Sequence, residues 1–112
     1  REAVTWYEAS LALNPDDVDV STDLGVSYYY TNQPDRALEQ FMHSLKVEPE
    51  HVKTILNIGI VRAFGKQDLA GAAEAWDRVI AIAPDSPEGR AAQQALESLR
   101  SAHAGDVATT GS

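Results

Sequence analysis

Residues 18–50 read VDVSTDLGVSYYYTNQPDRALEQFMHSLKVEPE and carry three landmarks that recur elsewhere in the chain. The landmarks are Leu24-Gly25 followed by Tyr28, Ala37 followed by Phe41, and Pro49. Prolines end three matching pieces at spacings of 34 and then 35 residues: Pro15, Pro49 and Pro84. A fixed period of this length is the sequence signature of stacked repeats, each of which covers an apolar face of its neighbour.

Other positions repeat in the same phase: Ala3, Ala37 and Ala72; Tyr7, Phe41 and Trp76; Gly25 and Gly59. This pattern resembles the tetratricopeptide repeat (TPR), whose signature is Trp-x-x-Leu-Gly-x-x-Tyr, Ala-x-x-x-Phe and Pro. The resemblance covers residues 1 to about 84. It implies an all-α fold, a right-handed superhelix of antiparallel helix pairs with about two and a half repeats and a C-terminal capping helix.

The chain departs from this signature in three places. Ser21 and Ile55 stand where the family favours tryptophan, and Arg62 stands where Tyr28 predicts an aromatic residue. The third unit also carries one extra residue, which we place between residues 63 and 68. This insertion leaves the register of Phe64 open by one position.

The repeat phase predicts one TPR domain, residues 1–103. Residues 104–112 are predicted to form a disordered tail, because this terminal segment is short and its residues are mostly small and polar. Within the domain, residues 1–15 hold the second helix of a truncated repeat, 18–51 and 52–86 are full repeats, and 87–103 form the capping helix. Proline cannot continue a helix and disfavours helical geometry in the residue before it, so the prolines mark the boundaries.

The capping helix is predicted from what it lacks. Residues 87–103 carry Gln93, Gln94 and Glu97 where the repeats have Leu-Gly-x-x-Tyr. A terminal repeat needs a polar outer face, because no further repeat covers it. Ser86 is the expected N-cap of this helix, with Pro87 in the first turn.

The other end of the stack is predicted to be open. The chain begins with Arg1 inside an apolar period and has a single methionine, Met42, so we interpret it as a piece of a longer protein. By repeat phase, the helix at residues 1–14 lacks its pair partner, so one apolar face should be uncovered. Trp6 and Tyr7 are the residues expected at this possible assembly edge.

The composition narrows the range of partners. The 112 residues include 17 acidic and nine basic side chains, for a net charge of −8. Phosphate contacts dominate nucleic-acid affinity, so we expect no nucleic-acid partner, and the same repulsion disfavours anionic membranes. No apolar run approaches the ~20 residues that span a bilayer, so this segment predicts no direct membrane contact. The absence of cysteine leaves the compartment open between cytoplasm and, in a bacterium, periplasm.

Catalysis finds little support in the sequence. The histidines are His43, His51 and His103, and none belongs to a zinc, phosphate-loop or nucleophile motif. A metal site built on His43 and His51 would need further ligands that the sequence does not place. We therefore expect no enzyme activity, no cofactor and no bound metal.

In the TPR family the first helix of each pair lines the concave face, where a partner peptide binds. With Leu24 and Tyr28 turned inward, the exposed stripe of residues 18–31 is predicted to be Asp19, Thr22, Asp23, Val26, Tyr29 and Tyr30. The matching stripe on residues 52–65 is Lys53, Leu56, Asn57, Ile60 and Phe64. Apolar and aromatic side chains on a concave face are typical of binding grooves. One of the three consecutive tyrosines must instead pack in the core, and Leu56 and Ile60 have the alternative of resting against the neighbouring helix.

Two functional classes remain open. The first is a non-catalytic protein–protein interaction module, a scaffold or adaptor that binds a peptide segment of a partner. The second is a self-assembly or intramolecular stacking element, with a possible homo-oligomer through the open N-terminal edge. Within the first class, Asp19 and Asp23 would repel a terminal carboxylate, so a segment with an apolar anchor and a lysine or arginine is favoured. A third possibility is that the piece spaces or regulates an enzyme domain elsewhere in a longer protein.

Overall fold

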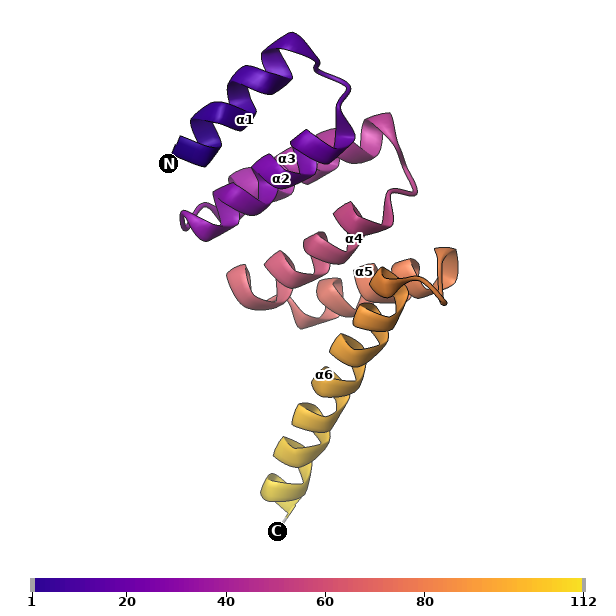
Figure 1. The fold of residues 1–112 in the computed structure, drawn as a ribbon. Coiled ribbons are helices and arrows are strands. Elements are labelled where there is room, and N and C mark those ends of the chain that lie inside the picture. Colours follow the sequence, from indigo (N-terminus) through magenta and orange to yellow (C-terminus); the bar gives the residue numbers. More distant parts are fainter. Residues whose placement is uncertain (1, 112) are drawn as a thin grey trace.

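The computed structural model describes the backbone of residues 2–111 and the side chains of residues 2–102. All regular elements in this part are helical: α1 Glu2–Leu13, α2 Val18–Tyr30, α3 Pro34–Val47, α4 Val52–Ile60, η1 Val61–Gly65, α5 Leu69–Ile82 and α6 Pro87–Gly111. Successive helices pack antiparallel into pairs, and the pairs stack into an elongated body of 57 × 30 × 18 Å (Figure 1). The predicted all-α solenoid of stacked helix pairs is confirmed.

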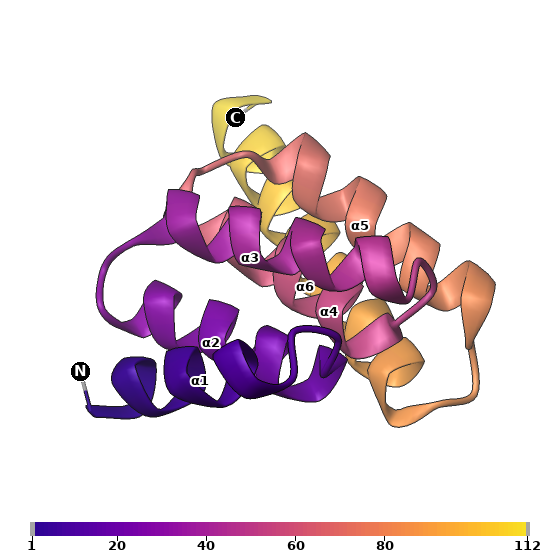
Figure 2. The same cartoon turned by 90° about the horizontal axis from the view of Figure 1, so that it is seen from above.

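The pairs form two layers. α2 lies in front of α3 and α4 lies in front of α5, as the view from above shows (Figure 2). α6 continues the front layer and packs against both α5 and α4, while α1 packs against α2 at the opposite end of the stack. The face turned to the viewer in Figure 1 is therefore built from α2, α4, η1 and α6, with α1 at its upper end.

The core of each pair is an aromatic ring seated on a glycine. Phe41 of α3 is fully buried, and its ring lies where a Cβ of Gly25 in α2 would be. Trp76 of α5 meets Gly59 of α4 in the same way and is 3% exposed. Glycine costs about 1 kcal/mol of helix propensity relative to alanine, so its place inside both helices follows from this close approach.

We expect Gly25→Ala to destabilise the fold. The added methyl overlaps the Phe41 ring, and overpacking of this kind costs about 1–3 kcal/mol, against about 1 kcal/mol gained in helix propensity. The free energy of unfolding in urea should therefore fall by up to about 2 kcal/mol. In a Phe41→Leu background the same substitution should cost less, because the ring is gone. An equal cost in both backgrounds would contradict the proposed contact.

The extra residue of the second full repeat is absorbed by a π-helical turn. In η1 the N–H of Lys66 donates to the carbonyl of Val61 at 3.1 Å, five residues back instead of four. A π-turn holds one more residue than an α-helical turn, so the register of the residues that follow changes by one position. Ala63, which is 7% exposed, takes the inward place of Tyr28, and Arg62 is displaced toward the surface, where it donates to the Gly71 carbonyl at 3.2 Å.

The insertion also settles the register of Phe64. Asn32 and Gln67 both adopt positive φ, 64° and 52°, in the turns that follow α2 and η1. These two positions are 35 residues apart, so Phe64 corresponds to Tyr29. The prediction placed the extra residue between residues 63 and 68, whereas the π-turn begins at Val61. Sequence alone missed it because a π-turn leaves no proline or glycine signal at its start.

Helix starts follow from side-chain caps. Asp17 accepts from the Val20 N–H at 3.1 Å, Asp68 accepts from the Gly71 N–H at 2.9 Å, and Ser86 accepts from the Gly89 N–H at 2.9 Å. Each cap satisfies an N–H group that the first helical turn leaves without a partner. The expected role of Ser86 is confirmed.

Some expected features differ in the structure. Met42 is 51% exposed, although the helical spacing of residues 35–48 placed it on the inward face, because Ala37, Phe41 and Ser44 take the buried face of α3. α6 continues to Gly111, beyond the end expected near residue 103 and into the segment expected to be disordered. No proline interrupts that segment, and extending an existing helix adds one hydrogen bond per ordered residue. Ser112 lies outside the described residues.

Across the described helices, none has the length and apolar character required to cross a bilayer.

Candidate functional site

The predicted stripe on α2 changes character along the helix. Asp19 is exposed at its start, and Asp23, Val26 and Tyr29 are half-buried. Tyr30 is 80% exposed at its end, while Tyr28 is 4% exposed in the core. The expectation that one of the three tyrosines packs inside and another contacts solvent is confirmed.

Thr22 was expected on the exposed stripe, and this prediction is wrong. Its side chain is fully buried, and its hydroxyl donates to the Val18 carbonyl at 2.8 Å. The hydroxyl of Thr54 in α4 lies 2.7 Å away, and it must donate because the hydrogen of Thr22 is already used. Thr54 then accepts from Nδ1 of His51 at 2.6 Å, which places a proton on that nitrogen. Thr22 therefore joins α2 to α4 and is not available to a ligand.

The predicted stripe on α4 is less exposed than its residue types suggest. Leu56 and Ile60 are half-buried and pack on the core cluster, which agrees with the alternative that they rest against a neighbouring helix. Lys53 is exposed, and the amide of Asn57 donates to the Lys53 carbonyl at 2.8 Å within its own helix. The two stripes lie side by side, and Tyr30 and Phe64 are their most exposed aromatic members in the described structure.

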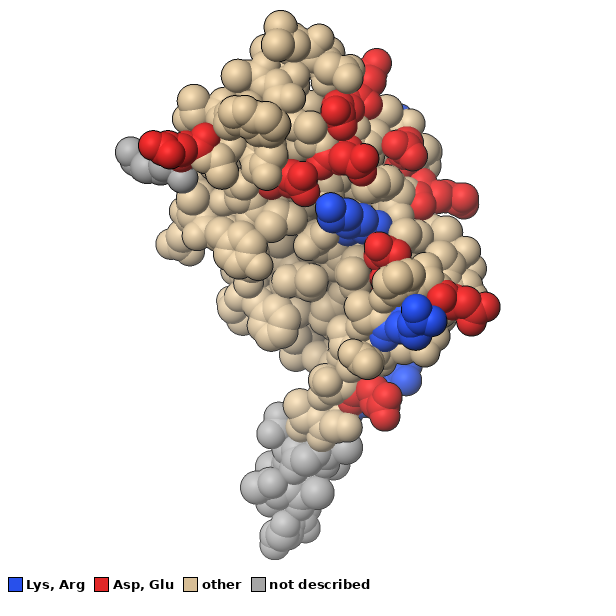
Figure 3. Space-filling model, viewed as in Figure 1, with Lys and Arg blue, Asp and Glu red and all other residues tan. Residues whose placement is uncertain are grey.

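Charged side chains lie at one end of this face and aromatic side chains at the other. Nζ of Lys53 lies 3.4 Å from Oδ1 of Asp23, and Nε2 of His51 lies 3.4 Å from Oδ1 of Asp19. In Figure 3 the red and blue atoms gather over the side where α2, α4 and α6 begin. The side where α2 and α4 end is almost free of charge in that view.

This pairing weakens any case for binding a terminal carboxylate. Lys53 already faces the Asp23 carboxylate, and the Asn57 amide is used inside α4. Asp19 and Asp23 would add repulsion to an incoming carboxylate.

The aromatic end contains a cavity of about 530 Å³. The rings of Tyr29 and Tyr30 lie 5.6 Å apart, centroid to centroid, at 50°. Phe64, which is 68% exposed, forms the opposite wall, together with the turn residues Asn32 and Gln67. The sequence named Phe64 with an open register and did not place the two turn residues in the site. Asparagine tolerates positive φ, so Asn32 carried a usable signal, whereas Gln67 did not.

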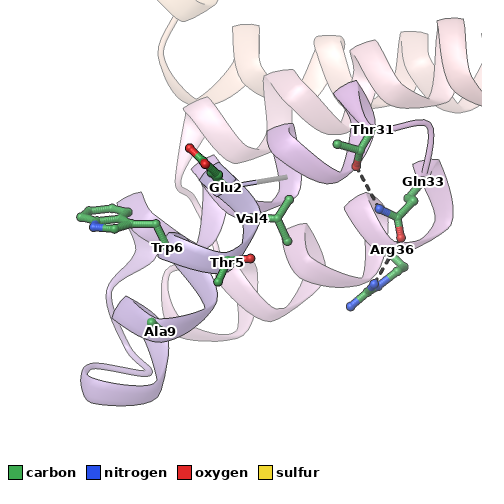
Figure 4. Close-up of a pocket in the computed structure, with 8 residues that line it drawn as sticks. All are labelled: Glu2, Val4, Thr5, Trp6, Ala9, Thr31, Gln33 and Arg36. Carbon is green, nitrogen blue, oxygen red and sulfur yellow. Dashed lines mark hydrogen bonds between the residues drawn. The ribbon is translucent and has the colours of Figure 1, made fainter.

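The N-terminal edge is a second open surface. None of the described residues of α1 is fully buried, and Trp6 is 63% exposed, with its ring 5.2 Å from that of Tyr7 in an edge arrangement. A cavity of about 1010 Å³ lies between α1 and the α2–α3 turn. Figure 4 shows Gln33 hydrogen-bonded to both Thr31 and Arg36 on one side and Trp6 on the other. Of the two residues expected at the open edge, Trp6 is exposed and Tyr7 is half-buried.

Tyr28 ties this edge to the core. Its hydroxyl donates to Oε2 of Glu8 at 2.7 Å, and Arg36 lies over its ring at 4.3 Å from the centroid while donating to the hydroxyl at 3.1 Å. Burial raises the pKa of the Tyr28 phenol above its ordinary value of 10.0, and the hydrogen bond and negative charge of Glu8 raise it further, against a lowering by Arg36. The folded state therefore favours the neutral phenol.

A phenol whose pKa is raised by folding stabilises the protein fully below its unfolded pKa of 10.0, and this contribution is lost as the pH rises toward the folded pKa. We expect the melting temperature to fall above about pH 10, and to fall less steeply in Tyr28→Phe, which has no phenol to ionise. Thermal unfolding by circular dichroism from pH 8 to pH 11 measures both slopes. Identical slopes would show that Tyr28 does not titrate differently in the two states.

The described residues hold no group of three or more His, Asp or Glu side chains close enough to bind a metal ion. His43 and His51 belong to separate contacts: His43 Nε2 lies 3.3 Å from the Pro15 carbonyl, and His51 joins Thr54 and Asp19. Side chains beyond residue 102, including His103, lie outside this description.

Comparison with known proteins gives two informative matches. No family model matches the chain. It is similar to the Homo sapiens protein O-mannosyl-transferase TMTC3, with 25% identity over 90 residues that make up 80% of this chain and 10% of TMTC3. It is also similar to the solved structure of YrrB, described as a TPR protein with an unusual peptide-binding site. That match has a TM-score of 0.73 and 25% identity and covers 81% of this chain and 46% of YrrB.

The stacked helix pairs, their glycine–aromatic contacts and the match to YrrB show the fold of a tetratricopeptide-repeat protein and support the resemblance to that family. The chain spans about a tenth of TMTC3 and less than half of YrrB. The transferase activity in the name of TMTC3 is therefore not carried over to this chain.

Proposed function

We propose that the chain is a non-catalytic protein-interaction module, a scaffold or adaptor that binds a peptide segment of a partner protein. The binding face is the one formed by α2, α4 and η1. The observation that carries the proposal is the exposed aromatic end of this face, where Tyr30 and Phe64 are 80% and 68% exposed beside a cavity of about 530 Å³. The similarity to YrrB, a TPR protein with a peptide-binding site, supports the same class of function.

Several features of the face suit a peptide. Exposed aromatic side chains provide large contact areas at a low cost in conformational entropy. Tyr30 offers a ring and a hydroxyl, and Asn32 and Gln67 add amide groups beside it. The half-buried Val26, Leu56 and Ile60 continue the apolar surface toward the charged end. Lys53 and the two aspartates, Asp19 and Asp23, then supply charges that fix the direction of a bound segment.

The first test compares two variants of similar size. In affinity capture from a lysate, we expect Tyr30→Ala to lose a partner that the parent domain holds, because truncating an exposed ring at a binding centre costs about 2 kcal/mol or more. Met42→Ala is the matched control, since Met42 is 51% exposed on α3, in the layer behind the proposed face. Circular dichroism should show both variants to be as helical as the parent. Retention of the same proteins by all three forms would contradict binding at the aromatic end.

The alternative is assembly through the N-terminal edge, and the exposure of Trp6 favours it. A simple head-to-tail stack of copies is disfavoured by the contacts inside the domain. Tyr7 takes the place of Phe41 in the repeat, so its partner helix should carry a glycine at the place of Gly25. α6 carries Gln94 at that place, seven residues after its start, and therefore does not accept the ring.

Analytical ultracentrifugation tests this alternative. If the edge is an assembly surface, the average mass should rise with concentration above 12.1 kDa, and Trp6→Ser should return it to the monomer value because the exposed indole is lost. A mass that stays at the monomer value at every concentration would rule out self-assembly of this domain. A rise that is unchanged by Trp6→Ser would place the contact elsewhere.

A further inference from the structure

We propose that a third cavity, bounded by η1, α5 and α6, is the anchor site of the bound segment and takes one bulky apolar side chain flanked by lysine or arginine. The inference rests on the proposed function and specifies where and how the partner is recognised. The cavity measures about 360 Å³, within the range of small-ligand pockets. Its lining residues are almost all apolar: Ile60, Ala63, Phe64, Leu69, Trp76, Ala95, Ser98, Leu99 and Ala102.

The cavity is open to solvent and apolar at its floor. Phe64 and Leu69 stand at its rim and are 68% and 52% exposed. Trp76 lies at the floor, 3% exposed, and its indole N–H donates to the Leu56 carbonyl at 3.3 Å. The indole therefore has no free donor for a ligand, and a polar group placed against it would lose its hydrogen bonds to water without replacement. An apolar side chain is the group that this floor accepts.

Two local features keep the space unfilled. The π-turn carries Phe64 to the rim of the cavity, where it also forms a wall of the aromatic cavity beside Tyr30. On the other side, α6 presents the small side chains Ala95, Ser98 and Ala102. Within the described side chains of α6 there is no aromatic residue to occupy the gap.

The charges around the cavity favour a cationic neighbour for the anchor. Nζ of Lys66 lies 2.7 Å from Oδ1 of Asp35, and Arg62 donates to the Gly71 carbonyl, so these two cations already have partners, while Arg100 is exposed next to Leu99 on α6. Glu97, next to Ser98 on α6, makes no ion pair within the described residues and lines a shallow depression that shares Ser98 with the anchor cavity. The net charge of −8 acts in the same direction.

The occupant is therefore a segment of a different protein, with an aromatic or large aliphatic residue between basic ones. Phe64 and Ser98 connect three depressions into one track that runs from Tyr30 to Glu97. A partner segment laid along this track would contact the aromatic end, bury its anchor between η1 and α6, and place a basic side chain near Glu97.

The test is a titration of the isotope-labelled domain by nuclear magnetic resonance with three acetylated and amidated pentapeptides. Their sequences are Gly-Lys-Phe-Lys-Gly, Gly-Glu-Phe-Glu-Gly and Gly-Lys-Ser-Lys-Gly. We expect saturable shifts at Phe64, Leu69 and Leu99 with the first peptide. The serine peptide, which lacks the anchor, should bind at least about ten-fold more weakly. The glutamate peptide, which reverses the charge, should bind several-fold more weakly.

Two variants of α6 that each introduce a phenylalanine provide the control. Ser98→Phe should fill the cavity from an exposed position and reduce the affinity of the first peptide about ten-fold or more. Ala91→Phe adds the same ring at an exposed position of α6 that lines none of the three depressions, and should leave the affinity within about two-fold. Glu97→Gln should remove most of the preference for the lysine peptide over the glutamate peptide.

Other outcomes overturn the inference in distinguishable ways. Shifts at Tyr30 and Leu56 without shifts at Phe64 and Leu99 would reject the anchor site and leave the proposed peptide-binding face in place. No saturable shift with any peptide would reject the anchor site, and the capture experiment with Tyr30→Ala would then decide the proposed function separately. Shifts of the same residues on concentrating the domain alone would assign the cavity to a second copy of the chain.

Discussion

The contact between an aromatic ring and a helical glycine sets the geometry of the whole stack. Phe41 on Gly25 and Trp76 on Gly59 bring the helices of each pair close enough to exclude water along their length. Protein interiors are packed as densely as organic crystals. A ring that rests against the glycine of the neighbouring helix therefore leaves no space for a methyl group at that glycine. The way in which the two helices of each pair cross follows from this fit. The spacing between neighbouring pairs follows from how one pair packs on the next.

The π-turn shows how such a stack tolerates an added residue. The glycine and the inward positions before it are fixed by the ring of α5, and the cap at Asp68 fixes the start of the next helix. The extra residue can only be accommodated between these two constraints, where Arg62 moves outward and Ala63 takes the inward place. The same adjustment brings Phe64 to the surface, so an irregularity in the backbone becomes a feature of the proposed binding face.

The polarity of the front face follows from the helix ends that compose it. Asp19, Asp23 and Lys53 lie in the early turns of α2 and α4 and satisfy one another or His51. The final turns carry aromatic residues and are followed by tight turns with positive φ at Asn32 and Gln67. A segment that bound across this face, as proposed, would meet charge at one end and aromatic surface at the other, and this difference would distinguish its two directions.

The sequence alone determined the repeat, the helix pairs, the core positions of Phe41 and Trp76 and the polar character of α6. Each of these depends only on residue type and on spacing along the chain. It also named Tyr30, Lys53 and Phe64 as members of the front face. Only the tertiary structure decided that Thr22 is buried, that Met42 is exposed and that Phe64 stands between two cavities. These outcomes depend on the hydroxyl pair between α2 and α4, on the face of α3 that meets α2, and on where the backbone absorbs one residue, and none of these is a local property of the chain.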